Sequence, residues 1–246
     1  MRNTNYDIGL EAEYLFSESI AEQSEIIELL KSEYSIDGDF LDATVKQERA
    51  RGRAKRDVRL LFDCGSNIDA SIKAYGADSN YNQLTRWTVD NFAKYFGLSD
   101  DVREDLRELI LAKCRNPRKV LLFPLNKRKM YEDIIKPIIA PILKESFSNN
   151  SSREILVLFD ENEGIMRIWK MEEVLDRISH TISYSSQGGN MVIGGCVYLQ
   201  RKGGNGQHIK VPRTSPDHPG NQIQPKLHTR DFIDLHHQSM LAEYNV

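Results

Sequence analysis

Three residues, Asp57, Ser71 and Lys73, have the types and the spacing needed for chemistry on a phosphate group. Hydrolysis of a phosphodiester needs a divalent cation that polarises the phosphate and generates hydroxide, and it is helped by a further cation near the attacking water. Magnesium takes oxygen ligands, in particular carboxylates, water and phosphate oxygens. An aspartate that holds the metal and a lysine that orients the water therefore predict metal-assisted phosphodiester hydrolysis, provided that the two side chains converge.

The chain around these residues is predicted to form a hairpin. Residues 57–63 and 68–75 have the pattern of two strands joined by a tight turn. Side chains alternate along a strand, so Asp69, Ser71 and Lys73 are expected on one face, while the aliphatic residues between them face the core. The lysine then lies opposite the aspartate that begins the first strand. Taken alone, this pattern is equally typical of a surface hairpin whose polar residues face water.

The charge of the chain is unevenly distributed. The 246 residues are 40% hydrophobic and 28% charged, with a net charge of −3. Residues 1–45 balance to −9, whereas residues 46–59 and residues 198–230 each balance to +5. A basic segment is more often a solvated face than a binding site. Two such segments, each beside a possible site, nevertheless predict a surface that holds phosphates, with residues 46–56 in that role.

Composition also argues against several classes of protein. No apolar run is long enough to span a bilayer, and the N-terminus has no stretch typical of a signal peptide, so a cytoplasmic location is expected. The three cysteines are scattered and lack metal-binding spacing, which argues against a disulfide framework and a zinc finger. The six histidines are not spaced like a metal site either.

The remaining elements are predicted from periodicity and turn residues. Helices are expected over residues 8–31 (one or two helices), 79–96, 99–113, 127–147 and 171–181, with interruptions at Pro137 and Pro141. Further strands are expected over residues 120–123, 154–159, 165–169 and 191–200. Residues 203–220 are predicted to form a long loop, and a loop of this length in a compact domain is more often functional than idle.

Residues 55–87, KRDVRLLFDCGSNIDASIKAYGADSNYNQLTRW, resemble the catalytic hairpin and following segment of small type II restriction endonucleases of the PD-(D/E)XK superfamily, in particular of the MspI group. In these enzymes an aspartate begins one strand, and an acid and a lysine two residues apart lie on the next. Here Ser71 stands at the position of the acid, which an amide commonly occupies in this group. The second carboxylate must then come from elsewhere, with Glu13 as the first candidate and Asp69 as the second.

Two further blocks carry the resemblance. Residues 195–206, GCVYLQRKGGNG, followed by NQIQPKL over residues 221–227, are similar to the C-terminal recognition segment of the group. Residues 9–13, GLEAE, match a Gly-x-x-x-Glu helix start, which favours Glu13 over Glu11 as the metal ligand. The blocks occur in the family order, whereas about residues 100–190 show no match.

The resemblance implies that the C-terminal block contacts DNA. Arginine and lysine donate to O6 and N7 of guanine, and glutamine can both donate and accept. Two glycines in succession let the backbone approach DNA closely. The predicted DNA-binding residues are Asn82, Gln83, Gln200, Arg201, Lys202, Gly203, Gly204, Gln224 and Lys226. The alternatives, in which these residues do not contact DNA, are a basic hairpin turn for the C-terminal block and helix capping for Asn82 and Gln83.

Together these patterns predict a type II site-specific deoxyribonuclease. It would bind Mg²⁺ through Asp57 and Glu13, use Lys73 to activate water and Ser71 to hold a metal-bound water or the lysine, and cut double-stranded DNA at a short GC-rich palindrome such as GCGC. The products would carry 5′-phosphates. A cognate DNA methyltransferase is expected as a genetic partner, and the enzyme is expected to act as a monomer or as a transient dimer on DNA, with no membrane partner.

The expected fold is α/β, a PD-(D/E)XK restriction-endonuclease-like mixed central sheet flanked by helices. Residues 1–246 would form a single nuclease domain, with the first helix and catalytic hairpin in residues 1–98 and the DNA-recognition segment in residues 190–230. Two other functions stay open. One is a structure-selective DNA repair or recombination nuclease, and the other is a non-catalytic DNA-binding protein of the same fold.

Overall fold

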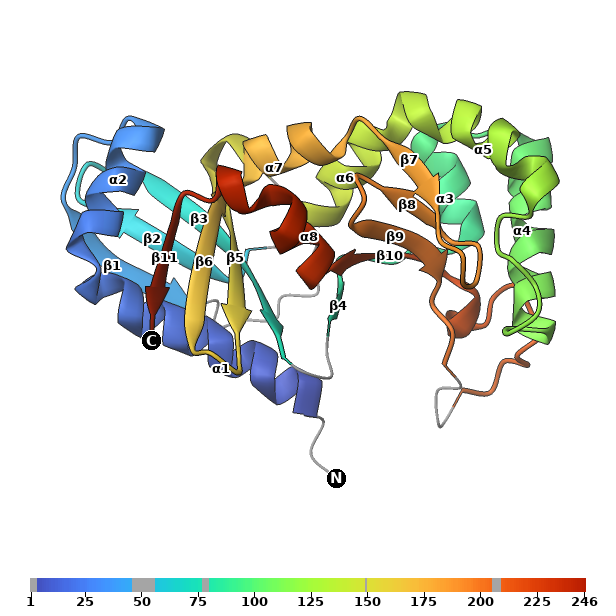
Figure 1. Cartoon of the computed structure of the whole chain (residues 1–246), viewed down its shortest axis with the longest axis horizontal. Coiled ribbons are helices and arrows are strands. Elements are labelled where there is room, and N and C mark those ends of the chain that lie inside the picture. Colours follow the sequence, from blue (N-terminus) through green and yellow to red (C-terminus); the bar gives the residue numbers. More distant parts are fainter. Residues whose placement is uncertain (1–3, 46–55, 77–79, 149, 205–208) are drawn as a thin grey trace. The chain divides into compact units, whose positions relative to one another are not determined.

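The computed structural model describes residues 4–45, 56–76, 80–148, 150–204 and 209–246, and it shows two compact units (Figure 1). The first unit comprises Met1–Asn82, Phe147–Leu175 and His236–Val246. The second unit comprises Gln83–Ser146 and Asp176–Leu235. The strands form two sheets, one of six strands and one of five. The expected α/β architecture with a mixed sheet and flanking helices is confirmed, but the strands are divided between two sheets.

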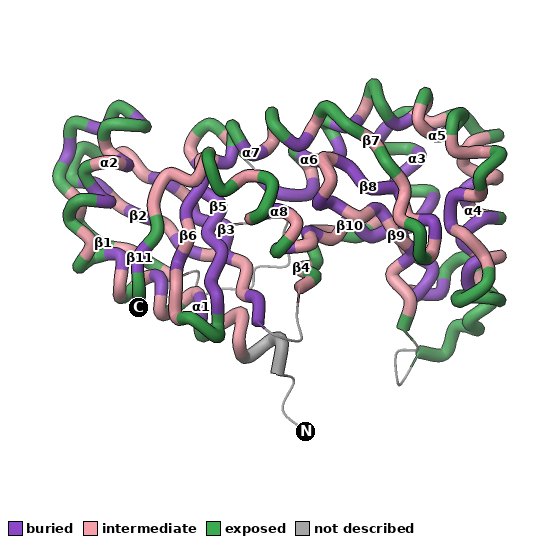
Figure 2. The backbone as a smooth tube through the Cα atoms, viewed as in Figure 1, coloured by how far each residue is buried: buried purple, intermediate pink, exposed green. Residues whose placement is uncertain are grey.

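The first unit is built on the six-stranded sheet, in the order β1-β2-β3-β5-β6-β11. Its strands are β1 (Phe40–Val45), β2 (Val58–Phe62), β3 (Asn67–Tyr75), β5 (Glu154–Asp160), β6 (Ile165–Lys170) and β11 (Ala242–Asn245). Strands β3 and β5 run parallel, with Lys73 opposite Leu158, and every other neighbouring pair is antiparallel. Strand β5 is buried over its whole length (Figure 2), as expected for a central strand covered on both faces.

One face of this sheet is apolar and packs against α1 (Thr4–Ser19) and α2 (Ser24–Tyr34). Helix and strand side chains belong to a single hydrophobic cluster that includes Ala12, Phe16, Ile20 and Leu30 with Ile68, Ala70, Ile72 and Val157. Because alternate residues of a strand point to opposite faces, Asp69, Ser71 and Lys73 lie on the other face of β3.

The second unit carries the five-stranded sheet, in the order β4-β10-β9-β8-β7. Its strands are β4 (Tyr81–Gln83), at the boundary between the units, and β7 (Ile182–Tyr184), β8 (Met191–Ile193), β9 (Val197–Arg201) and β10 (Ile223–His228). The other helices are α3 (Val89–Phe96), α4 (Asp100–Arg115), α5 (Arg128–Ile135), α6 (Ile139–Phe147), α7 (Met171–Ile178) and α8 (Thr229–His236). Short 3-10 turns are η1 (Ile20–Glu22), η2 (Leu125–Lys127), η3 (Lys136–Ile138), η4 (Ser151–Arg153), η5 (Pro219–Asn221) and η6 (His237–Ser239).

Local sequence explains where several helices start and stop. The hydroxyl of Thr88 accepts a hydrogen bond from the Asn91 amide at 3.1 Å and begins α3. The hydroxyl of Ser99 accepts one from the Val102 amide at 3.4 Å and begins α4. Such caps satisfy amides that have no partner within the helix. Gly97, in the left-handed region with φ of 68°, ends α3.

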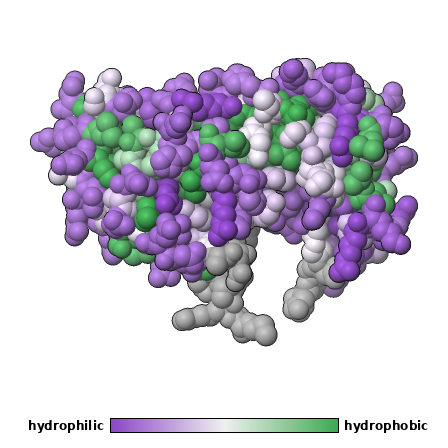
Figure 3. All heavy atoms as spheres, viewed as in Figure 1, coloured by the Kyte–Doolittle hydropathy of each residue, from purple (hydrophilic) through white to green (hydrophobic). Residues whose placement is uncertain are grey.

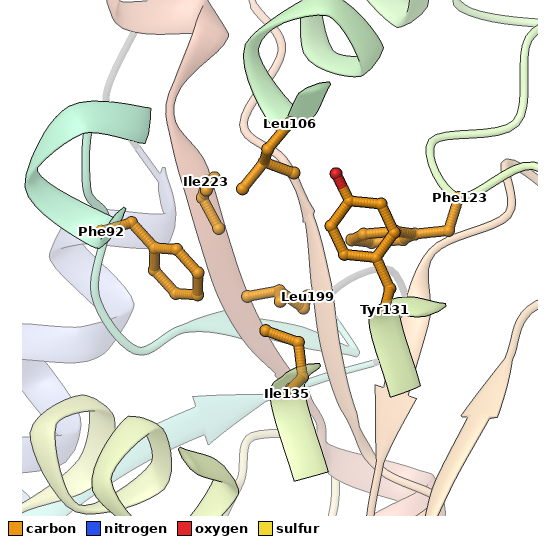
Figure 4. A pocket seen from close by; sticks show the side chains of 7 residues that line it. All are labelled: Phe92, Leu106, Phe123, Tyr131, Ile135, Leu199 and Ile223. Carbon is orange, nitrogen blue, oxygen red and sulfur yellow. The ribbon is translucent and has the colours of Figure 1, made fainter. Parts of the chain in front are cut away.

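The core of the second unit is apolar and almost filled. Figure 4 shows seven side chains around a residual cavity of about 10 Å³: Phe92, Leu106, Phe123, Tyr131, Ile135, Leu199 and Ile223. A space of this size holds at most one water, and an apolar lining offers water no partners, so the cavity is a packing defect and not a ligand site. Leu199 of β9 and Ile223 of β10 point toward it, so the alternate residues of these strands face the other way.

Several predicted elements are confirmed. The N-terminal helices, both strands of the hairpin, β5, β6 and the helices within residues 99–113 and 127–147 occur as expected, and the last of these regions is broken at Pro137. The helix predicted from residue 79 begins only at Val89, because Tyr81–Gln83 form β4 instead.

Two strand predictions were wrong. Residues 120–123 form no strand, because the Leu122 and Phe123 amides donate to the carbonyls of Gly188 and Gly189, at 2.8 and 2.9 Å, in a loop. The strand predicted over residues 191–200 is a hairpin of β8 and β9. Gly194 and Gly195, with φ of 59° and 73°, reverse the chain between them, so Met191 pairs with Leu199.

The visible surface is mainly hydrophilic, with apolar residues in separate patches (Figure 3). Within the described ranges, no helix has both the length and the apolar composition needed to cross a bilayer.

Candidate active site and nucleic-acid interface

Asp57 is held against β3 by both its backbone and its side chain. The residue directly precedes β2, which pairs with β3 so that Val58 lies opposite Ala70. Its amide donates to the Ala70 carbonyl at 2.8 Å, and its Oδ2 accepts from the Ile72 amide at 2.7 Å. The carboxylate is therefore fixed over the middle of β3, on the face opposite to α1 and α2.

The Lys73 ammonium lies among three oxygens that the hairpin supplies. Its Nζ is 3.3 Å from Oδ2 of Asp57, 3.0 Å from Oγ of Ser71 and 2.8 Å from the carbonyl oxygen of Ile72. The Lys73 and Asp57 side chains are 18% and 23% exposed, so a solvent molecule or ligand can still reach them. These contacts show that Asp57, Ser71 and Lys73 converge on one face of the sheet. We call the three oxygens the oxygen cradle.

The other acids considered as metal ligands are placed differently. Asp69 forms a two-pronged ion pair with Arg59, at 2.6 and 2.9 Å, and lies 3.8 Å from Arg56. The hydrogen bond to Asp69 raises the pKa of Arg59, so this carboxylate is engaged in ion pairing on the hairpin. Glu13 lies on α1, whose buried residues pack on the opposite face of the sheet from Lys73. The hydrogen bonds of Lys73 thus bring Asp57 and Ser71 together, whereas Asp69 is engaged with Arg59.

The oxygen cradle suits a hard divalent cation in its chemistry. A carboxylate, a hydroxyl and a backbone carbonyl are oxygen donors of the kind that Mg²⁺ and Ca²⁺ accept. The cradle has one carboxylate, however, and no group of three or more His, Cys, Asp or Glu side chains that could hold a metal occurs in the described part of the chain. Much of the coordination of such an ion would therefore come from water and phosphate oxygens. The Ile72 carbonyl could not have been proposed from residue types, because every residue has a carbonyl.

In the second unit, β9 and β10 gather five polar side chains on one face. Gln200 pairs with Gln224, and Tyr198 pairs with Lys226. The pairing continues beyond the strands, where the Lys202 amide donates to the Gln222 carbonyl at 2.9 Å. Paired residues of antiparallel strands share a face, so this polar face carries Gln200, Lys202, Gln222, Gln224 and Lys226. Gln222 was not among the predicted residues, and its pairing with Lys202 is the signal that identifies it.

The polar face concentrates positive charge. Burial lowers the pKa of Lys226, and the neighbouring positive charge of Lys202 lowers it further. Two ammonium groups that destabilise each other favour an anion placed between or above them. Gln224 is only 2% exposed, whereas Gln200, Lys202 and Lys226 are half-buried and remain accessible.

Arg201 lies on the opposite side of β9 from its neighbours Gln200 and Lys202. It is 9% exposed, and its Nε donates to Oδ1 of Asn221 at 2.9 Å. The side-chain Nδ2 of Asn221 in turn donates to the carbonyls of Arg213 and Ser215, at 2.9 and 2.6 Å. Burial lowers the pKa of Arg201. This chain of contacts makes Arg201 a support for the loop after β9 in this structure, and its guanidinium is not presented on the polar face.

The other predicted contact residues lie in turns or at the boundary strand. Gly203 and Gly204 have φ of 71° and 77°, and the Gly203 amide donates to the Gly220 carbonyl at 2.9 Å. These glycines are thus required by the backbone at the base of the loop. The side-chain Nδ2 of Asn82 donates to the carbonyl of Ala74, next to Lys73 along β3, at 3.0 Å, and Gln83 is exposed. Neither caps a helix, since Thr88 caps α3. Of the basic segment 46–59, residues 46–55 lie outside the described residues.

No protein-family model matches the chain, and no curated protein matches it by sequence. The chain is similar to the crystal structure of restriction endonuclease MspI in complex with its cognate DNA, with 16% sequence identity and a TM-score of 0.46. The likeness covers 90% of this chain and 86% of that chain. A likeness at this level transfers no residue role, so the roles below rest on the contacts of this chain.

Proposed function

We propose that the chain is a magnesium-dependent endonuclease that cuts double-stranded DNA as a type II restriction enzyme. The observation that supports it is the convergence of the Asp57 carboxylate, the Ser71 hydroxyl and the Lys73 ammonium on one face of β3. A metal-binding oxygen set beside a cation is what phosphodiester hydrolysis requires. The sequence resemblance to the MspI group includes the residues of this hairpin and points to the same chemistry.

A Mg²⁺ ion bound at this site would supply polarisation of the scissile phosphate and would favour hydroxide formation from water. Asp57 would hold the metal, with Glu13 as the proposed second carboxylate. Lys73 would orient the attacking water and stabilise negative charge on the phosphate, and Ser71 would hold a metal-bound water or the lysine. Attack on the phosphorus with departure of the 3′ oxygen leaves the 5′-phosphate ends that we expect.

The polar face of β9 and β10 is the proposed recognition surface. Gln200, Lys202, Gln224 and Lys226 are proposed to contact base edges or phosphates, because lysine and glutamine match the donors and acceptors of the major groove. Asn82, Gln83 and the Gly203–Gly204 backbone are proposed as further DNA contacts. Arg201 is proposed to support the loop after β9 through Asn221, in place of the expectation from sequence that it reads a base directly.

The biological setting belongs to the same proposal. Residues 1–246 would act as one nuclease domain in the cytoplasm, as a monomer or a transient dimer on DNA, and a cognate methyltransferase would protect host DNA. The sequence resemblance extends to HhaI endonuclease in overall size, which is the reason to test GCGC as the first recognition site.

The test is cleavage of plasmid DNA in Mg²⁺ by the parent protein and by Asp57→Asn, Lys73→Ala and Asp69→Asn. Asp69→Asn is the matched control, because it changes an acid on the same face of β3 that pairs with arginines. We expect discrete, reproducible fragments from the parent and the control and none from the other two variants. A smear would refute the site-specific enzyme, and preference for branched DNA would favour a repair nuclease. Binding without cleavage by every protein would favour the non-catalytic alternative.

A further inference from the structure

The Lys73 ammonium already occupies the oxygen cradle that a metal would use. A carboxylate oxygen has two lone pairs, and Oδ2 of Asp57 already accepts from the Ile72 amide at 2.7 Å and from Lys73 at 3.3 Å. The Ser71 hydroxyl and the Ile72 carbonyl also accept from the same ammonium, at 3.0 and 2.8 Å. The Lys73 ammonium is therefore placed among these oxygens as a bound cation would be.

We propose that Lys73 and the divalent cation compete for the oxygen cradle, so that Lys73 holds the site in a metal-free resting state. This inference rests on the proposed nuclease function and adds a regulatory step to it. Two positive charges attracted to the same oxygens repel each other, and in a partly buried site this repulsion is only weakly screened. The ammonium is covalently attached to the chain, whereas the metal ion exchanges with solvent, so the ammonium occupies the cradle when no metal is bound.

DNA would release this competition. The lysine stem is flexible, and its ammonium is a compact charge that can turn from one acceptor to another. A phosphate that approaches the partly exposed Lys73 side chain would give the ammonium a new anionic partner, and the cradle oxygens would then become available to the metal. Metal and DNA would thus bind with positive coupling, and by linkage each would tighten the binding of the other by the same factor. The enzyme would load its metal mainly when a substrate is present.

The experiment measures Mn²⁺ binding to the full-length protein without DNA, through the electron paramagnetic resonance signal of free Mn²⁺. The variants are Lys73→Met, which removes the charge and keeps the length of the side chain, and Lys73→Arg, which keeps the charge. Lys170→Met is the matched control. Lys170 lies on β6, pairs with Glu33 at 2.9 Å and does not contact the cradle. Circular dichroism and thermal unfolding check that each variant is folded.

We expect Lys73→Met to bind Mn²⁺ more tightly than the parent, by about tenfold, which is a typical size for coupling between sites. Lys73→Arg and Lys170→Met should stay within the error of the parent or bind more weakly. Asp57→Asn added to Lys73→Met should remove the gain, which locates the bound ion at the cradle. If Lys73 had a purely structural role, the Mn²⁺ affinities of Lys73→Met and Lys73→Arg would not differ in this way.

Unchanged or weaker Mn²⁺ binding by Lys73→Met would overturn the competition, because the ammonium would then not be the group that excludes the ion. The same conclusion holds if no variant binds Mn²⁺ measurably. A gain that survives Asp57→Asn would also overturn it, since the ion would lie elsewhere. Failure of the nuclease proposal is a separate outcome. It would appear as absence of Mg²⁺-dependent cleavage by the parent, whatever the Mn²⁺ affinities are.

Discussion

The two faces of β9 and β10 allow DNA binding to be separated from stability by neighbouring substitutions. Lys202 and Lys226 lie on the polar face, whereas Leu199 is 2% exposed and lines the apolar core. We predict that Lys202→Ala and Lys226→Ala weaken DNA binding. Lys202→Ala should leave the free energy of unfolding nearly unchanged, and Lys226→Ala should not lower it, because burial and the charge of Lys202 disfavour the Lys226 ammonium in the folded chain. Leu199→Ala should do the reverse, because it changes the core and removes no group from the polar face.

The expected sizes follow from what each side chain contacts. A lysine that neutralises one phosphate contributes about 0.9 to the slope of log K against log salt concentration, so each lysine removed should reduce the slope by about 1. If a lysine reads guanine instead, its loss should cost about 1–3 kcal/mol on the cognate site and little on unrelated DNA. Truncation of a buried leucine costs about 2–5 kcal/mol of folding free energy. Binding and stability effects of these sizes are readily resolved.

The assay is fluorescence anisotropy of a labelled GCGC duplex and of an unrelated duplex, in Ca²⁺ to prevent cleavage, over a series of salt concentrations. Denaturant unfolding of the same preparations supplies the free energies. If both lysine variants keep the affinity and the salt slope of the parent on both duplexes, the polar face is not the DNA interface. Equal destabilisation by Lys226→Ala and Leu199→Ala would show that the assignment of faces is wrong.

Three further predictions test other parts of the structure. Arg201→Ala and Asn221→Ala should each destabilise the protein. Because one hydrogen bond of 2.9 Å joins the two side chains, the double variant should lose less folding free energy than the sum of the two single losses. Additive losses in denaturant unfolding would contradict this coupling. The lowered pKa of Lys226 means that the unfolded chain binds more protons than the folded one between the folded-state pKa and the ordinary pKa of a lysine, so stability should rise with pH in this window. DNA affinity should fall as the pH rises through this window, because Lys226 must take up a proton before its ammonium can bind a phosphate. A Lys226→Arg variant keeps its charge and should not show this fall. An identical fall in the variant would contradict the role of Lys226 in DNA binding. Ellman's reagent at neutral pH should label Cys64 first, because it is exposed and a Ser66 hydrogen bond lowers its pKa, while burial raises the pKa of Cys196 to about 12; equal rates for all three cysteines would refute this order.

The hairpin that carries Asp57 and Lys73 was predictable because its signals are local. Strand periodicity places Ser71 and Lys73 on one face, and a turn of four residues brings the two strands into register. Helix caps and proline positions likewise depend on a few neighbouring residues. Alternation along β9 similarly predicts that Arg201 and Lys202 point to opposite faces, whatever the rest of the chain does.

Which of those two faces meets the core was decided only by tertiary structure. Leu199 and Ile223 turn toward side chains from α3, α4 and α5, so Arg201 is buried with Asn221 and Lys202 stays accessible. The division into two sheets, the edge strands β1, β4, β7 and β11, and the packing of α1 on the apolar face of the six-stranded sheet depend in the same way on long-range packing. Local patterns record how a segment alternates, but burial is a property of what packs against it, and that partner is distant in the sequence.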